Sequence, residues 1–188
     1  MTEEILIDKA KSGDRTALAE LVKKYEQTVY NFAFKICRDR DRAENTMQET
    51  FLSMVKHLGQ FDGKSKLSTW LYRIISNHCL MEMRKKKFEY FDLDHADEDE
   101  LVSQKYFVDS AKIPDEAAEN SELKKVLDEA IKKLAPEYRL VFLLRDVEEL
   151  STEETAQISG LSIPAVKSRL HRARAFLRNE ITKAFKDE

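Results

Sequence analysis

The chain of 188 residues has little glycine and proline, with four and three copies respectively. These residues shape tight turns, so their scarcity argues against an all-β fold, which needs many hairpins, and favours a mostly helical protein. Long apolar runs are missing as well, since stretches such as Val141–Leu144 are far too short to span a bilayer. The acidic start leads into no apolar block, and we therefore expect no signal peptide and no direct membrane insertion.

Cysteine is rare too. Cys37 and Cys79 are too few for a disulfide framework, and they predict a reduced chain in the cytoplasm. His57 and His78 supply no second ligand pair with metal-binding spacing, because neighbours such as His78 and Cys79 point roughly 100° apart on a helix. A metal or redox sensor is the weaker interpretation, and core or surface roles are favoured for these side chains. Without a phosphate loop or a hydrolase motif, the sequence predicts neither a cofactor nor an enzyme.

The net charge is small, at −3, and taken alone it suggests no anionic partner. The distribution is uneven, however. Residues 63–88 have seven basic groups and one acidic group, and residues 155–188 have seven and three, which gives +6 and +4. Residues 1–62 are nearly neutral at −1, whereas residues 89–154 have a charge of −12. The chain therefore contains two basic segments separated by an acidic one.

Apolar residues recur three and four positions apart along most of the chain, which predicts amphipathic helices. The apolar stripe that ends near Leu58 includes Val55, and Gly59 follows at a position where a left-handed residue commonly ends a helix. Ser68 or Thr69 is predicted to cap the next helix. We expect an all-α protein of two small helical domains, an N-terminal bundle over 1–88 and a helix-turn-helix domain over 118–188, joined by an acidic linker over 89–117.

The predicted linker has an acidic composition, with six acids among the nine residues Asp92–Glu100 and a break at Pro114. Such a composition is typical of flexible chain. A solvated loop is the simpler interpretation, and the other is that the acids shield a basic surface until a partner binds.

The C-terminal segment has the signals of a helix-turn-helix. Ser151 and Glu154 form a predicted capping box, and Gly160 provides a turn. Ser162 can cap the second helix, with Pro164 in its first turn. Together these signals predict a short helix, a glycine turn and a longer recognition helix.

The predicted recognition helix separates apolar from basic side chains. No acid occurs from Thr155 to Asn179, whereas five Lys or Arg residues do. A cationic helix with hydrogen-bonding side chains near its N-terminus suits the DNA major groove. The predicted buried stripe is Val166, Leu170, Ala173 and Leu177. The side chains outside it are Lys167, Ser168, His171, Arg172, Arg174 and Arg178.

The N-terminal basic segment mixes cations with aromatic and amide side chains, a combination that suits unstacked bases. Trp70 and Tyr72 are equally typical of core or rim aromatics, and the run Arg84–Lys87 could be a solvated helix end. The segment also contains Lys64, Lys66, Arg73, Asn77 and His78.

Four segments carry motifs of a known family: Asp41–Phe51 and Phe61–Ile74 in the first half of the chain, and Leu150–Ala156 and Ile163–Arg174 in the second. The first two resemble the second conserved region, and the last two the fourth, of bacterial RNA polymerase sigma factors of the extracytoplasmic-function (ECF) type in the sigma-70 family. Asn45 and Met81 stand where the family commonly has Asp.

The resemblance implies a transcription factor, of a family linked to stress responses, that binds core RNA polymerase and directs promoter-specific initiation. Promoter DNA and an anti-sigma factor are the further partners that it implies. It implies that domain 1–88 reads the minus-ten element through Lys64, Lys66, Trp70, Arg73, Asn77, Arg84 and Lys85. It implies that domain 118–188 reads the minus-thirty-five element through Lys167, Ser168, His171, Arg172 and Arg174. It implies contact with the clamp of the largest polymerase subunit through Asp41, Glu44, Gln48 and Glu49.

Two other classes stay open on the residues alone. A conventional helix-turn-helix repressor or activator explains residues 150–179 but not the 41–74 block. An adaptor sequestered by a partner is compatible with the sigma-factor interpretation, while an enzyme is the weakest reading.

Overall fold

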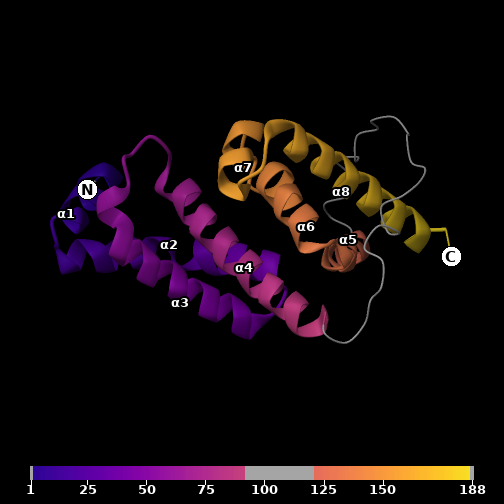
Figure 1. Ribbon diagram of the computed structural model, residues 1–188, viewed down its shortest axis with the longest axis horizontal. Coiled ribbons are helices and arrows are strands. Elements are labelled where there is room, and N and C mark those ends of the chain that lie inside the picture. The colour runs from indigo at the N-terminus through magenta and orange to yellow at the C-terminus, as the bar shows by residue number, and fades with distance from the viewer. Residues whose placement is uncertain (1, 92–120, 187–188) are drawn as a thin grey trace.

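A computed structural model describes residues 2–91 and 121–186, and every regular element in these ranges is a helix (Figure 1). The helices form two domains, as predicted, one N-terminal and one C-terminal. The acid run of the predicted linker and Pro114 lie outside the described residues. Within those residues, no helix is long and apolar enough to cross a membrane.

Two helices of the N-terminal domain begin at side-chain caps. Asp14 accepts hydrogen bonds from the amides of Thr16 and Ala17, at 2.8 and 3.1 Å, and so starts α2. Asp39 accepts from the amide of Arg42 at 2.9 Å and starts α3. The elements are α1 (Glu3–Lys11), α2 (Arg15–Cys37), α3 (Arg40–His57), the short 3₁₀ turn η1 (Leu58–Gln60) and α4 (Leu67–Phe91).

The core of this domain lies where α2 packs against α1, α3 and α4. The predicted stripe of α2 supplies much of it, because residues spaced by three and four share one face. Burying such side chains contributes roughly 1.5–3 kcal/mol each, which is the main force holding the bundle together. The large side chains that are fully buried here are Leu21, Val29, Phe32, Ile36, Met54, Leu67, Leu71 and Ile75.

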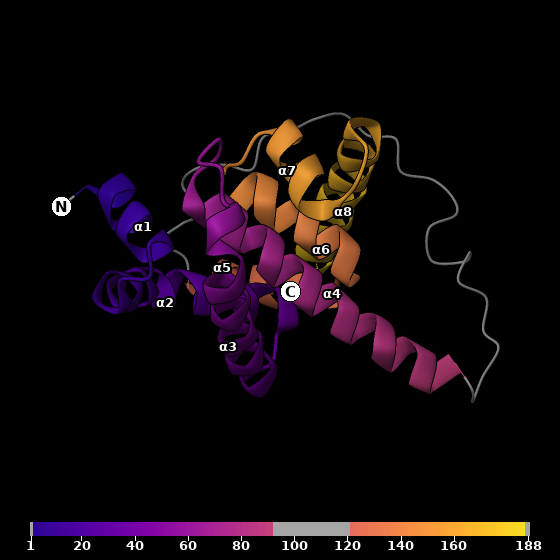
Figure 2. The same ribbon diagram turned by 60° about the vertical axis from the view of Figure 1, so that its left-hand side comes forward.

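The C-terminal domain packs its helices around α8 (Figure 2). Pro136 occupies the first turn of α6, where its missing amide costs nothing, as the sequence predicts. The elements are α5 (Ser121–Lys133), α6 (Pro136–Phe142), the π-helical turn η3 (Leu143–Val147), α7 (Thr152–Ser159) and α8 (Ile163–Ala184).

Three local predictions are wrong. Gly59 lies in η1 without a left-handed backbone, and Arg38, with φ of 55°, takes that conformation at the end of α2 instead. Val55 is 50% exposed, because Met54 fills the buried position beside it. Helix α4 begins at Leu67, so Ser68 and Thr69 lie inside its first turn rather than before it.

Candidate nucleic-acid interface

The predicted helix-turn-helix is formed by α7 and α8. The Ser151 hydroxyl accepts from the amide of Glu154 at 3.1 Å, and the Glu154 carboxylate accepts from the amide of Ser151 at 2.8 Å. These bonds from Ser151 hold the pKa of the Glu154 carboxyl below its usual value. Gly160 closes α7 with a left-handed φ of 68°, and the Ser162 hydroxyl caps α8 by accepting from the amide of Ala165 at 3.3 Å.

Helix α8 exposes the side chains predicted to contact bases. They fall at positions i, i+1, i+4 and i+5 and therefore lie on one face. The opposite face is the predicted buried stripe, Val166, Leu170, Ala173 and Leu177, all of which are buried. The exposed set is Lys167, Ser168, His171 and Arg172.

Arg174 differs from these four because it is bound to its own domain. Its Nε and Nη2 donate to the two carboxylate oxygens of Asp146, at 2.8 and 2.6 Å. This bidentate pair raises the pKa of Arg174 and fixes its guanidinium against η3. Arg172 has only one long contact, 3.5 Å from its Nη1 to the Tyr138 hydroxyl.

Helix α4 carries a second candidate face. Trp70, Arg73 and Asn77 are spaced by three and four residues, so they lie along one side of the helix. Arg73 and Asn77 are exposed. Trp70 is half-buried and packs on the ring of Phe61, with centroids 5.6 Å apart, which makes it a rim aromatic. The side chains of Arg84 and Lys85 lie outside what the structure describes.

The loop before α4 presents Lys64 and Lys66 to solvent while its start is anchored in the core. Phe61 is buried, and its carbonyl accepts from Lys11 Nζ at 2.6 Å. Asp62 accepts from the amide of Lys64 at 3.1 Å, and this bond lowers the pKa of the Asp62 carboxyl. The exposed cations therefore stand on a loop that is fixed at Phe61.

Helix α3 has an outward row of polar side chains that continues into two apolar ones. Leu52 and Val55 are 53% and 50% exposed, one and two turns beyond Gln48. The exposure of this pair is not predicted from the sequence. The available signal is the spacing of Met54 and Leu58, because these two buried residues, four positions apart, already supply the core face of the helix. The exposed polar members are the four candidate polymerase contacts, Asp41, Glu44, Gln48 and Glu49.

The two domains pack against each other, with α4 against α6 and α7 and α2 against α6 (Figure 2). Glu148, in the segment between η3 and α7, receives one bond from each of two N-terminal helices, α2 and α4. Lys35 Nζ of α2 donates to its Oε1 at 2.9 Å, and the Tyr72 hydroxyl of α4 donates to its Oε2 at 2.7 Å. Tyr72 is a core residue, since its ring is buried and lies 4.2 Å from that of Phe32.

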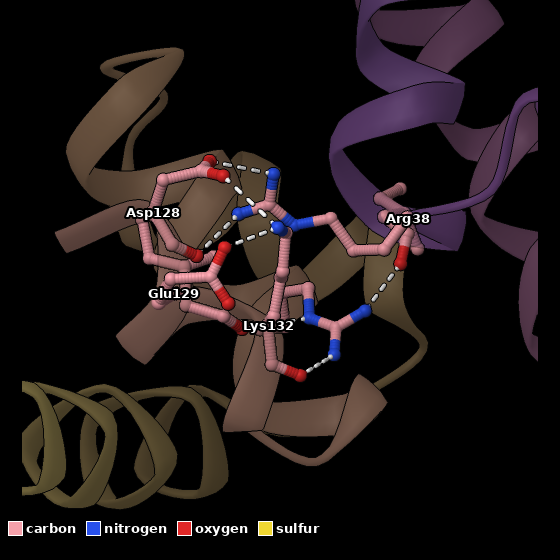
Figure 3. A network of polar contacts seen from close by, with 7 residues as sticks. Arg38, Asp128, Glu129 and Lys132 are labelled. Carbon is pink, nitrogen blue, oxygen red and sulfur yellow. Dashed lines mark hydrogen bonds and ion pairs between the residues drawn. The ribbon is translucent and has the colours of Figure 1, made fainter. Parts of the chain in front are cut away.

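Two arginines fasten the end of α2 to the C-terminal domain, and Figure 3 shows the first, Arg38, beside Asp128. Arg38 Nη1 donates to Asp128 Oδ1 at 2.8 Å, and its Nη2 donates to the Asp128 carbonyl at 3.2 Å. Lys132 shares this cluster, with its Nζ 3.7 Å from Asp128 and 2.5 Å from Glu129. Arg139 is buried, and its Nη1 donates to the Ile36 carbonyl at 2.7 Å.

Comparison with known proteins decides the family. Sigma-70 region 2 matches residues 21–89, and Sigma-70, region 4 matches residues 124–177. The ECF RNA polymerase sigma factor SigW of Bacillus subtilis is 33% identical over 176 residues, covering 93% of this chain and 94% of the relative. The chain belongs to the ECF sigma factors of the sigma-70 family. Its class of function is therefore promoter-directed transcription initiation, and its relatives are sigma factors rather than enzymes.

Other relatives of this ECF sigma factor agree. The RNA polymerase sigma-H factor of Pseudomonas aeruginosa is 29% identical and covers 92% of this chain and 90% of its own. RpoE from Bartonella quintana, solved with the anti-sigma factor NepR, has a TM-score of 0.65 and 26% identity, covering 87% of this chain and 96% of that one. CnrH, solved with the cytosolic domain of CnrY, has the same fold, with a TM-score of 0.63, 22% identity, and coverage of 96% and 97%.

Proposed function

We propose that this sigma factor binds core RNA polymerase and reads two promoter elements, the minus-ten element with domain 1–88 and the minus-thirty-five element with domain 118–188. The observation that carries the proposal is the pair of separate exposed faces, one on α4 and one on α8, that combine cations with hydrogen-bonding groups. The face on α4 lies in the segment that matches sigma region 2, and the face on α8 lies in the segment that matches region 4. The resemblance to these regions implies that both bind DNA.

In the C-terminal domain, α8 enters the major groove of the minus-thirty-five element. Lys167, Ser168, His171 and Arg172 then lie toward base edges, with Arg172 suited to the O6 and N7 acceptors of guanine. Arg174 contacts a phosphate, and to do so it exchanges one of its bonds to Asp146 for the phosphate oxygen.

In the N-terminal domain, the loop with Lys64 and Lys66 and the face of Trp70, Arg73 and Asn77 bind the minus-ten element as a separated strand. Extruding a base from the stack costs a few kcal/mol of stacking free energy. Contacts of that base with the loop and with the helix offset this cost. Both lysines are exposed, which favours contact with phosphate, and Lys64 exchanges its 3.1 Å ion pair with Asp62 for the phosphate oxygen. The resemblance to region 2 also assigns Arg84 and Lys85, further along α4, to binding of this strand.

The outward face of α3 binds the clamp of the largest polymerase subunit. Its polar row, Asp41, Glu44, Gln48 and Glu49, supplies hydrogen bonds and charge. Leu52 and Val55 supply apolar surface beside this row, which can be buried at the centre of the interface.

An anti-sigma factor is the proposed regulator, acting in the cytoplasm. Support comes from the solved complex of RpoE with the anti-sigma factor NepR, whose sigma subunit shares 26% identity with this chain.

Run-off transcription with core polymerase tests the proposal. The purified protein should start transcripts at specific promoters of its own genome. Asn77→Ala should slow promoter opening, which is measured by the permanganate reactivity of the minus-ten strand. Its affinity for core polymerase should stay within about twofold. Glu49→Lys should lower core affinity instead, so each variant serves as the control for the other. No specific start at any promoter, or tight binding of a palindromic site without polymerase, would contradict the proposal.

A further inference from the structure

The two cysteines of the chain meet in the core of the N-terminal domain. Cys37 is the last residue of α2, Cys79 lies on α4, and the two are separated by 42 positions in the sequence. Their sulfur atoms are 2.6 Å apart, close to the roughly 2.05 Å of a disulfide bond. Both thiols are free in the structure, and both are buried.

We propose that Cys37 and Cys79 form a modification site, a dithiol that is oxidised to an intramolecular disulfide between α2 and α4. The proposal does not depend on the assignment of promoter elements. Since the chain has no third cysteine, neither sulfur has a competing partner within the molecule. Because the sulfurs are already in contact, bond formation needs only a small shift of the two helices.

The surroundings make Cys37 the sulfur that reacts first. The hydrogen bond from the Cys79 thiol lowers the pKa of Cys37, and the same contact raises the pKa of Cys79. Cys37 is also 7% exposed, whereas Cys79 is fully buried, so a small oxidant reaches Cys37 first. The Thr46 hydroxyl lies 3.8 Å from Cys37 Sγ and 3.9 Å from Cys79 Sγ, so it is a polar neighbour of both sulfurs and the order of reaction rests on exposure.

A hydroperoxide is the class of oxidant that fits such a narrow approach. The Cys37 thiolate attacks the terminal peroxide oxygen, the O–O bond breaks, and the departing alkoxide, or hydroxide from hydrogen peroxide, takes the proton that Cys37 gave up. The Cys79 sulfur then attacks the sulfenic sulfur of Cys37, the S–O bond breaks, and water leaves with the Cys79 proton. With hydrogen peroxide, two thiols and one peroxide give one disulfide and two waters.

The link would be placed at the junction of the two domains. The residues on either side of Cys37 contact the C-terminal domain, Ile36 through its carbonyl to Arg139 and Arg38 through its guanidinium to Asp128. A disulfide therefore fixes the end of α2 to α4 beside this contact, and it closes a loop that contains all of α3. Closing a loop of this size restricts the unfolded chain and raises the melting temperature, here by at least about 5 °C.

The experiment treats the full-length protein, reduced and freed of reductant, with one to a few equivalents of hydrogen peroxide, then denatures it and alkylates remaining thiols. Mass spectrometry should show loss of two hydrogens, no alkylation, and one linked peptide containing Cys37 and Cys79. The melting temperature should rise and return to its starting value with dithiothreitol. Recovery of two alkylated thiols, or oxidation only to disulfide-linked dimers or to sulfinic acid, would overturn the proposal.

Single-cysteine variants assign the two roles. Cys79→Ser should stop at oxygen adducts on Cys37, without a rise in melting temperature, and Cys37→Ser should leave Cys79 alkylatable after denaturation. The oxidation rates of the two single-cysteine variants test the order of reaction. If Cys79 in the Cys37→Ser variant is oxidised faster than Cys37 in the Cys79→Ser variant, the proposed order is wrong. The wild-type measurement stands without these variants, and their helical circular dichroism shows whether each is folded.

Discussion

The Tyr72 hydroxyl donates to Glu148 Oε2 at 2.7 Å and so connects the middle of α4 to the segment that leads into the helix-turn-helix. The other carboxylate oxygen of Glu148 accepts from Lys35 at 2.9 Å. A single carboxylate thus joins α2 and α4 of one domain to the other domain.

Tyr72→Phe should lower the free energy of unfolding by about 1–2 kcal/mol, because a hydrogen bond to a charged, mostly buried acceptor is lost while the ring contact with Phe32 remains. Urea denaturation measures the change. Tyr30→Phe is the matched control, since Tyr30 is half-buried and stacks on Phe34. Equal effects of the two variants would show that the bond to Glu148 contributes nothing.

Arg139→Met should destabilise the protein by about 3 kcal/mol, because the buried guanidinium donates to several carbonyls that would lose their partners. Its Nε and Nη2 donate to the carbonyls of Ile131, Lys132 and Leu134 at 3.0, 2.6 and 2.8 Å. The exposed Arg40→Met is the control and should change stability by less than about 0.5 kcal/mol. A small effect at Arg139 in guanidinium denaturation would mean that water replaces these bonds without cost.

Gly160→Ala should destabilise the helix-turn-helix by about 1–2 kcal/mol, since its left-handed φ of 68° strains any residue with a Cβ. Apart from its chain neighbours, no atom of the described residues lies within 4 Å of the position that the new Cβ would occupy, so the cost is backbone strain. Gly59→Ala, which also meets open space but has no left-handed backbone, should be neutral or slightly stabilising. Thermal unfolding that ranks the two variants in the opposite order would contradict this reasoning.

Arg172→Ala and Arg174→Ala should separate DNA binding from folding. Arg172 has one long contact, so its loss should reduce discrimination at the minus-thirty-five element by about 1–3 kcal/mol with little change in stability. Arg174 is bound to Asp146 by two bonds, and its loss should lower thermal stability as well as weaken binding across all sequences. Competition binding with the holoenzyme and melting curves check both, and identical behaviour of the two variants would remove the distinction.

The capping box should make stability depend on pH. The pKa of Glu154 is lowered in the folded state, so its contribution is fully present above the unfolded value near 4.5 and is lost as pH falls through the folded value. Glu154→Gln should therefore remove part of the decline in melting temperature between pH 5 and 3, compared with the exposed neighbour Glu153→Gln. Parallel declines in the two variants would show that the cap does not titrate in this range.

Much of the local structure could be predicted from the sequence because its causes are local. The cap at Ser151, the turn at Gly160 and the buried stripe from Val166 to Leu177 each depend on residues within a few positions of one another. The spacing of α2 likewise predicts the core position of Phe32.

The failures depend on partners far along the chain. Arg38 takes a left-handed backbone beside a carboxylate ninety positions away, and periodicity carries no signal for such a pair. Glu148 and Arg139 read as ordinary charges, although both join the domains. The candidate base-contacting residues of α8 are exposed as expected, while Arg174 proved to be paired, because the sequence gives no register between α8 and η3.

The docked arrangement of the domains has a consequence for how they separate. If they part, Arg139 gives up the Ile36 carbonyl but retains the three acceptors of its own domain. The Glu148 carboxylate exchanges Lys35 and Tyr72 for water, which solvates carboxylates well. These polar contacts can therefore be exchanged for water while the hydrogen bonds within each domain remain.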